Sequence, residues 1–223
     1  MSDYPCNSEH YLAQGQAIAQ VLLCHGAGAG KSHTTMVAIA QSLQQQGFDV
    51  ISYNFEYMVT IEQTGRRRPP PKLPLLVAEL AKIIDALPTG LPLLLAGKSM
   101  GARVAISQLS ETALNALSHQ PIAALAYGYP FLPPRSKQAP RLTPLQQAIR
   151  PVLVHQGERD GFGNRASVAQ WDLATTQLHW LNSADHDLTP LKRSGYTQQS
   201  LLEEAALRTK QFLIDTLKER CKP

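Results

Sequence analysis

The sequence feature that most constrains the fold is a tight turn between an apolar run and a helical pattern. The run Leu91 to Ala96 leads into Gly97-Lys98-Ser99-Met100-Gly101, which matches G-x-S-x-G and opens a stretch with helical spacing. As a bare string this pattern is weak evidence, but here a strand and a helix are expected on its two sides. Small residues around the serine let strand and helix pass closely while the hydroxyl projects above the sheet. The sequence therefore predicts a strained strand-to-helix turn that exposes Ser99.

The rest of the chain repeats this alternation of short apolar runs and longer helical patterns. Such a rhythm is typical of parallel strands joined by helices that cover both faces of a sheet. We therefore predict an α/β fold with a mostly parallel central sheet, in one domain spanning residues 1–223. Strands are predicted at Ala19–Cys24, Asp49–Asn54, Leu91–Ala96, Ala123–Tyr127, Pro151–Gln156 and Gln177–Leu181. Helices are predicted at about Thr34–Gln46, Leu73–Leu87, Ser99–Leu117, Arg165–Ala174 and Gln198–Glu219.

Two proline-rich stretches, Glu56 to Lys72 and Pro130 to Pro144, interrupt this alternation. Each follows a predicted strand, so each should lie at the carboxyl edge of the sheet, where open α/β folds bind ligands. The second stretch is too short to hold a helical cap domain. We therefore expect no cap domain, and loops that cover the site. Whether Glu56 to Lys72 folds over Ser99 as a lid stays open.

A second group of residues could activate the serine. A serine hydroxyl is a weak nucleophile near neutral pH, so it needs a base within hydrogen-bond reach and a group that orients the base. The chain order expected for this turn is nucleophile, acid, histidine. Asp160 follows the fifth predicted strand and His186 follows the sixth, at the edge that carries Ser99. We predict Ser99 as nucleophile, His186 as general base and Asp160 as orienting acid, with Glu158 as a rival for the acid.

The glycine-rich loop after the first predicted strand has two interpretations. It reads His25-Gly26-Ala27-Gly28-Ala29-Gly30-Lys31-Ser32, and a loop ending in Gly-Lys-Ser between a strand and a helix is typical of phosphate-binding P-loops. That pattern requires glycine at position 25, where this chain has histidine. The other interpretation is that the loop donates a backbone N–H to an oxyanion hole. We predict that the N–H groups of Ala27 and Met100 form that hole.

Composition and charge narrow the remaining classes of protein. A net charge of +4 and a pI near 9.0 would suit a nucleic-acid partner, but no recognition module accompanies the dispersed basic residues. Three widely spaced cysteines form no CxxC motif and indicate neither a disulfide framework nor a zinc site. No apolar run approaches the roughly 18 residues that span a bilayer. We therefore expect a cytoplasmic protein with no membrane segment, nucleic-acid partner, metal or cofactor.

Four side chains near the predicted turns are candidates for binding a substrate. Lys98 lies inside the turn, where its ammonium group would favour an anionic substrate, unless its stem packs and the ammonium reaches solvent. Tyr57, Tyr129 and Phe131 follow predicted strands and are candidates for lining an acyl or leaving-group pocket. Aromatic residues at strand ends are also typical of the edge of a core.

These motifs resemble those of small α/β-hydrolase-fold proteins of the dienelactone-hydrolase-like kind. They are most similar to little-characterised bacterial hydrolases related to testis-expressed hydrolase-like proteins. The resemblance spans roughly Gln20 to Leu217. It implies an α/β-hydrolase fold with Ser99, Asp160 and His186 as a triad, and it implies no particular substrate. The segments that carry it are His25 to Gly30, Gly97 to Arg103, Tyr127 to Pro134 and Gly157 to Asp160.

Together these residues predict a serine hydrolase that cleaves an ester or thioester of a small acyl substrate through an acyl-enzyme. We expect it to act as a monomer or homodimer. A hypothesis from another class is a catalytically idle α/β-hydrolase fold that serves as an interaction module, because a fold alone does not establish turnover. The reactivity of Ser99 towards an organophosphonate distinguishes the two.

Overall fold

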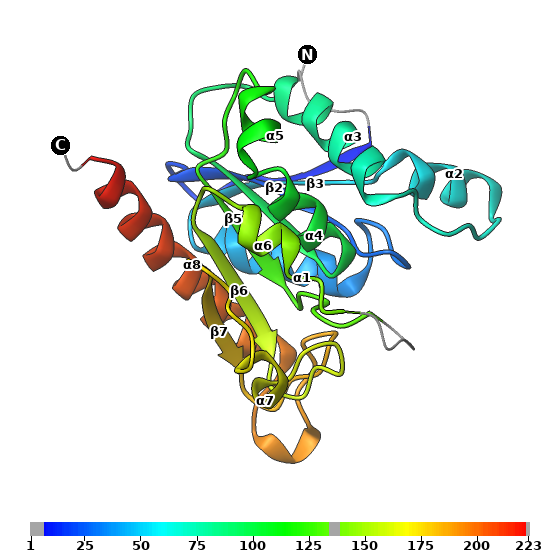
Figure 1. Cartoon of the computed structure of the whole chain (residues 1–223), viewed down its shortest axis with the longest axis vertical. Helices are drawn as coiled ribbons and strands as arrows, with labels where there is room; N and C mark the ends of the chain where they lie inside the picture. Colours follow the sequence, from blue (N-terminus) through cyan, green and yellow to red (C-terminus); the bar gives the residue numbers. More distant parts are fainter. Residues whose placement is uncertain (1–6, 134–138, 222–223) are drawn as a thin grey trace.

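The computed structural model describes residues 7–133 and 139–221, which form a sheet of seven strands in the order β1-β3-β2-β4-β5-β6-β7 (Figure 1). Strand β1 runs antiparallel to β3, and the other neighbouring pairs are parallel. The α/β fold with a mostly parallel sheet is therefore confirmed. The strands are β1 (Ser8–Tyr11), β2 (Ala19–Cys24), β3 (Phe48–Tyr53), β4 (Leu93–Lys98), β5 (Ala123–Tyr127), β6 (Val152–Gly157) and β7 (Gln177–Leu181).

Helices cover both faces of this sheet, as expected, and each face has its own core (Figure 1). Successive residues of a strand point to opposite faces, so Leu95 of β4 packs with α3 and α4 while Leu94 packs with α1 and α8. Within the described ranges nothing forms a separate cap domain. The helices are α1 (Thr34–Gln45), α2 (Glu56–Thr64), α3 (Leu73–Asp85), α4 (Met100–Ser107), α5 (Glu111–Asn115), α6 (Thr143–Gln147), α7 (Arg165–Val168), the 3₁₀ turn η1 (Lys192–Ser194) and α8 (Gln198–Arg220).

Three predicted segments differ from the structure. The helix expected over Ser99–Leu117 is two helices, because Ser110 bridges Ala148 between α4 and α5 and interrupts the helical backbone. The helix expected over Arg165–Ala174 is the single turn α7. The stretch Glu56 to Lys72 is not irregular throughout: its first nine residues form α2, and prolines are confined to the part that follows.

The parallel strands place their carboxyl ends at one edge of the sheet. The loop after β2, the turn after β4 and the loops after β5, β6 and β7 therefore meet there. These are the loops that carry the residues predicted to act in chemistry. None of the helices in the described part of the chain is both long and apolar enough to cross a membrane.

A histidine pair joins strands β6 and β7 beneath α8. His155 is fully buried, and its Nδ1 lies 2.9 Å from Nδ1 of His179. Its Nε2 lies 2.9 Å from Oγ1 of Thr209 in α8. Burial, with a smaller contribution from His179, holds the pKa of His155 well below its usual range. His155 is therefore neutral in the folded protein at mildly acidic pH.

This histidine makes stability depend on pH. In the unfolded chain the imidazole takes up a proton below about pH 6.5, whereas the folded protein keeps His155 neutral. The contribution of His155 to the free energy of unfolding is present in full above that pH and is lost as the pH falls. Between about pH 7.5 and 5.5, urea titrations should show that the free energy of unfolding falls by about 1 kcal/mol more in the wild type than in His155→Gln.

A control is Gln45→Ala at an exposed position of α1, which removes no titratable group and should keep the wild-type pH dependence. Equal pH dependence in wild type and His155→Gln would contradict the assignment.

Candidate active site

Ser99 lies between β4 and α4 in a backbone conformation that residues other than glycine rarely adopt. Its φ is 53° and its ψ is −110°, and its N–H donates to the carbonyl of Tyr127 at 3.2 Å. The neighbouring glycines explain how this conformation is held. A Cβ on Gly97 would collide with the backbone of Gly101 and Ala102, and one on Gly101 would collide with the backbone of β2 and its loop. Close backbone packing therefore forces the turn that presents the Ser99 hydroxyl.

The structure brings Ser99, His186 and Asp160 together in one hydrogen-bonded chain. The Ser99 Oγ lies 2.9 Å from Nε2 of His186, and Nδ1 of His186 lies 2.8 Å from Oδ2 of Asp160. A carboxylate accepts a hydrogen bond from Nδ1–H, which leaves the Nε2 lone pair free to accept from the serine hydroxyl. Because the three residues come from three different loops, only the folded sheet assembles this chain.

Asp160 is fully buried and held by donors besides His186. Gln156 Nε2 donates to its Oδ2 at 2.8 Å, and the N–H of Phe162 donates to its Oδ1 at 2.8 Å. The rival Glu158 lies elsewhere: it accepts from the N–H of Ser183 and pairs with Arg165, and these contacts lower the pKa of its carboxyl group. Of the two acids considered, only Asp160 reaches the histidine.

Gln156 is a central residue of the site that the sequence analysis did not single out. Its Oε1 accepts from the N–H of Tyr129 at 2.8 Å, and its Nε2 also lies 3.0 Å from the carbonyl of Gly163. This amide therefore ties β6 to the loops that carry Asp160 and Tyr129. A polar side chain inside an otherwise apolar strand needs buried partners. The glutamine in the apolar run of β6 is therefore the sequence feature that could have indicated this role.

The loop that carries His186 turns back towards Ser99 through its own hydrogen bonds. Asp185 Oδ1 accepts from the N–H groups of Asp187 and Thr189, each at 3.0 Å. Gly128 lies beneath the imidazole with φ +65°, and a Cβ there would lie 2.9 Å from the carbonyl of His186. The ring of Phe162 packs edge-on against the imidazole at 4.5 Å between centroids. The imidazole is thus positioned from several sides.

The loop after β2 runs beside Ser99 and is held from behind. His25 is buried: its Nδ1 lies 2.6 Å from the carbonyl of Gly26, and its Nε2 accepts from the N–H of Phe55 at 3.1 Å. Burial lowers the pKa of His25 to about 4, so the ring stays neutral near pH 7. Ala27 and Met100 both line the cavity at Ser99, and nothing in the described part of the chain accepts from their N–H groups.

The phosphate-loop interpretation finds no support in the position of Lys31. Its ammonium group pairs with Glu9 at 2.6 Å, and its N–H donates to Asn54 Oδ1 at 2.8 Å. A P-loop lysine instead reaches over the phosphates that the loop holds.

Within residues 7–133 and 139–221, no three His, Cys, Asp or Glu side chains gather in a way that could hold a metal ion.

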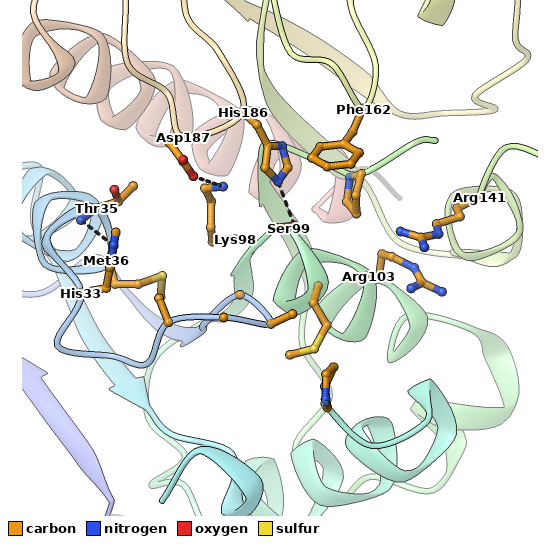
Figure 2. A pocket seen from close by; sticks show the side chains of 17 residues that line it. His33, Thr35, Met36, Lys98, Ser99, Arg103, Arg141, Phe162, His186 and Asp187 are labelled. Atoms are coloured by element: carbon orange, nitrogen blue, oxygen red, sulfur yellow. Dashed lines mark hydrogen bonds and ion pairs between the residues drawn. The ribbon is translucent and has the colours of Figure 1, made fainter. Parts of the chain in front are cut away.

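A cavity of about 560 Å³ opens above Ser99 (Figure 2). Lys98 lines it, and its ammonium group lies 3.3 Å from Oδ1 of Asp187. Burial is the main influence on Lys98 and lowers its pKa, while Asp187 acts in the opposite direction. Pro70, from the segment between α2 and α3, also lines the cavity.

Three aromatic residues predicted to line this pocket do not do so. Tyr57 is buried and its hydroxyl donates to the carbonyl of Ala27 at 3.1 Å, behind the loop. Tyr129 is buried and its hydroxyl donates to the carbonyl of Arg141 at 2.7 Å. Phe131 packs against Tyr129 and Trp171. These side chains face the core, so they support the walls of the cavity rather than forming its surface.

Comparison with known proteins agrees with this fold. A family model described as an alpha/beta hydrolase domain matches residues 17–214. The chain therefore belongs to the α/β hydrolase domain family. A search of curated proteins found no match.

Many solved structures are similar to the chain. A dienelactone hydrolase from Anabaena variabilis is 18% identical over 93% of this chain and 90% of its own, with a TM-score of 0.63. An α/β serine hydrolase homologue from Coxiella burnetii is 15% identical over 92% and 93%, with a TM-score of 0.66. Est1E from Butyrivibrio proteoclasticus is 13% identical over 95% and 94%, with a TM-score of 0.61. At these identities the likeness to solved structures shows the fold alone. Together with the match to the family model, it supports a hydrolase.

The buried amide of Gln156 is a direct test of how the site is held. In Gln156→Leu, the N–H of Tyr129 loses its acceptor and Asp160 loses a donor inside the protein. Buried groups left without partners should lower the free energy of unfolding by about 2–4 kcal/mol, measured by urea denaturation.

The same substitution at the exposed Gln211 of α8 serves as control and should change this free energy by less than about 0.5 kcal/mol. A Gln156→Leu variant as stable as this control would show that the amide does not hold the site.

Proposed function

We propose that this protein is a serine hydrolase that cleaves a carboxylic ester or thioester through an acyl-enzyme. The observation that carries the proposal is the hydrogen-bonded chain from Ser99 Oγ through His186 to the buried Asp160, beside an open cavity. A nucleophile, a base and a group that orients the base are the parts that such a reaction requires.

In the first step, the Ser99 oxygen attacks the carbonyl carbon of the substrate. His186 Nε2 accepts the hydroxyl proton as the new C–O bond forms. Asp160 keeps the imidazole in the tautomer with hydrogen on Nδ1 and stabilises the positive charge that develops on the ring. When the tetrahedral intermediate collapses, the bond to the leaving group breaks and His186 returns the proton to the leaving oxygen or sulfur.

The negative charge on the tetrahedral oxygen needs donors. The N–H of Met100 is at the first position of α4, where the helix offers no acceptor and its dipole favours negative charge. The N–H of Ala27 lies on the facing loop, which His25 and Tyr57 hold from behind. Loss of one such donor typically costs about 3 kcal/mol of transition-state stabilisation. We therefore assign both amides to an oxyanion hole.

In the second half of the reaction, a water molecule takes the place of the leaving group. His186 removes its proton as the water oxygen attacks the acyl carbon, and the proton then passes to Ser99 as the acyl bond breaks. The products are a carboxylic acid and the free enzyme. Similar solved structures named as esterases and a dienelactone hydrolase support an ester as the bond that is cleaved.

A fluorophosphonate probe tests the proposal because it reacts with activated serines. The purified protein should be labelled at Ser99, as mapped by peptide mass spectrometry. Labelling should be absent in Ser99→Ala and at least about 100-fold slower in His186→Ala, because the general base is lost.

Ser118→Ala, an exposed serine outside the cavity, is the control and should be labelled as the wild type is. Circular dichroism should verify that each variant is folded. A folded wild-type protein that does not react would contradict the proposal and favour the idle interaction module instead.

A further inference from the structure

Two arginines line the cavity beside Ser99, and the proposed mechanism uses neither. Arg103 lies on α4 and Arg141 lies just before α6. Figure 2 shows their guanidinium groups together on one side of Ser99, with Lys98 and Asp187 on the opposite side. The cavity therefore has a strongly basic wall next to the reacting hydroxyl.

Neither arginine has a carboxylate partner among residues 7–133 and 139–221. The Nε of Arg103 is buried and has no hydrogen-bond partner in that part of the chain. The neighbouring positions 134–138 contain no acidic residue. By contrast, Lys98 in the same cavity pairs with Asp187. Arg165, which lies outside the cavity, pairs with Glu158. The charge of this arginine pair is thus not balanced within the site.

Both arginines are attached to backbone that is held in place. The N–H of Arg103 donates to the carbonyl of Ser99 at 3.3 Å, which puts this arginine one helical turn from the nucleophile. Arg141 donates its N–H to the carbonyl of Phe131 at 2.7 Å and accepts at its own carbonyl from the Tyr129 hydroxyl at 2.7 Å. Tyr129 and Phe131, which do not line the cavity, therefore position one of its charged walls.

Placing two like charges together in a partly dehydrated site is unfavourable unless an anion binds between them. Burial lowers the pKa of Arg141, and the charge of Arg103 lowers it further. Guanidinium groups present planar pairs of N–H donors that match the two oxygens of a carboxylate or phosphate. An oxyanion bound between the two guanidinium groups would balance their charge.

We propose that Arg103 and Arg141 form an anion subsite, and that the substrate is an ester carrying a carboxylate or phosphate group near its carbonyl. This inference rests on the proposed function for the reacting bond. Arg103 follows Ser99 by one helical turn, and the side chains of a helix tilt towards its N-terminus, so its guanidinium group lines the cavity on the side of the nucleophile. We therefore expect a short chain of a few carbons between the ester and the anion. The arginine pair, and not Lys98, therefore binds the anionic group of the substrate, because Asp187 already balances the charge of Lys98.

A binding experiment tests the subsite without turnover. Glutarate and inorganic phosphate are titrated calorimetrically, at fixed ionic strength, into the Ser99→Ala protein. At least one should bind, and adding Arg103→Gln or Arg141→Gln should weaken binding about 10-fold to 100-fold, as expected for loss of a charge-assisted contact. Tighter binding of glutarate would point to a carboxylate substrate, and tighter binding of phosphate to a phosphorylated one.

Arg220→Gln removes the same charge at the exposed end of α8 and should leave the affinity within about twofold. Arg103→Lys offers a second variant if the glutamine variant does not fold: it keeps the charge but loses the planar fork, and should bind more weakly than the wild-type residue. The subsite would be overturned if neither anion binds, or if every anion that binds does so equally well without the two arginines.

A turnover experiment extends the test to substrate choice. The wild type should have a higher kcat/KM for mono-4-nitrophenyl glutarate than for the uncharged 4-nitrophenyl valerate of equal acyl length. In Arg103→Gln or Arg141→Gln this ratio should fall about 10-fold or more. A ratio that is unchanged in both variants, in a protein that fluorophosphonate still labels at Ser99, would overturn the subsite and leave the serine hydrolase standing. Anion binding through the arginines in a protein whose Ser99 does not react would support the subsite and overturn the hydrolase.

Discussion

The backbone contact between strand β4 and helix α4 is the constraint on which the rest of the site depends. Gly97 lets β4 pass directly against the backbone at the start of α4, and Gly101 lets α4 pass directly against the end of β2. Between these two contacts Ser99 takes a φ of 53°. Such a conformation costs about 1–3 kcal/mol. Each fully buried leucine contributes about 1.5–3 kcal/mol, so Leu94 and Leu95 alone offset the strain. The core around β4 thus keeps the serine side chain in place at the cavity above the sheet.

Buried polar groups then align the remaining residues with that hydroxyl. Asp160 is removed from water, and hydrogen bonds from Gln156, Phe162 and His186 compensate for the loss. The same glutamine holds the backbone of Tyr129, whose hydroxyl in turn holds the backbone of Arg141. One connected set of hydrogen bonds therefore links the acid at the end of the Ser99 chain to the basic wall of the cavity. The residues proposed to react and the residues proposed to bind an anion therefore share the same support.

Much of the fold and of the position of the site could be predicted from the sequence. Buried parallel strands appear as apolar runs, and the loops that follow them meet at one edge of the sheet. The bounds of β2, β5 and β7 agree with prediction, whereas the short polar edge strand β1 carries no such signal. Directions of side chains were harder to predict: Tyr57 and Phe131 follow strands as expected but face the core. The arginine pair left no pattern in the sequence, since only the fold brings two positions so far apart to the same wall.

The most direct test of the central claim is a rapid-mixing experiment with 4-nitrophenyl acetate, read by nitrophenol release and by mass spectrometry of the intact protein. A mechanism through an acyl-enzyme predicts a burst of about one nitrophenol per chain, together with an acetyl group that maps to Ser99. Turnover without a burst and without an acyl group on Ser99 would contradict a mechanism through an acyl-enzyme. A folded protein that neither releases nitrophenol nor becomes acetylated would contradict the claim that this geometry activates the serine.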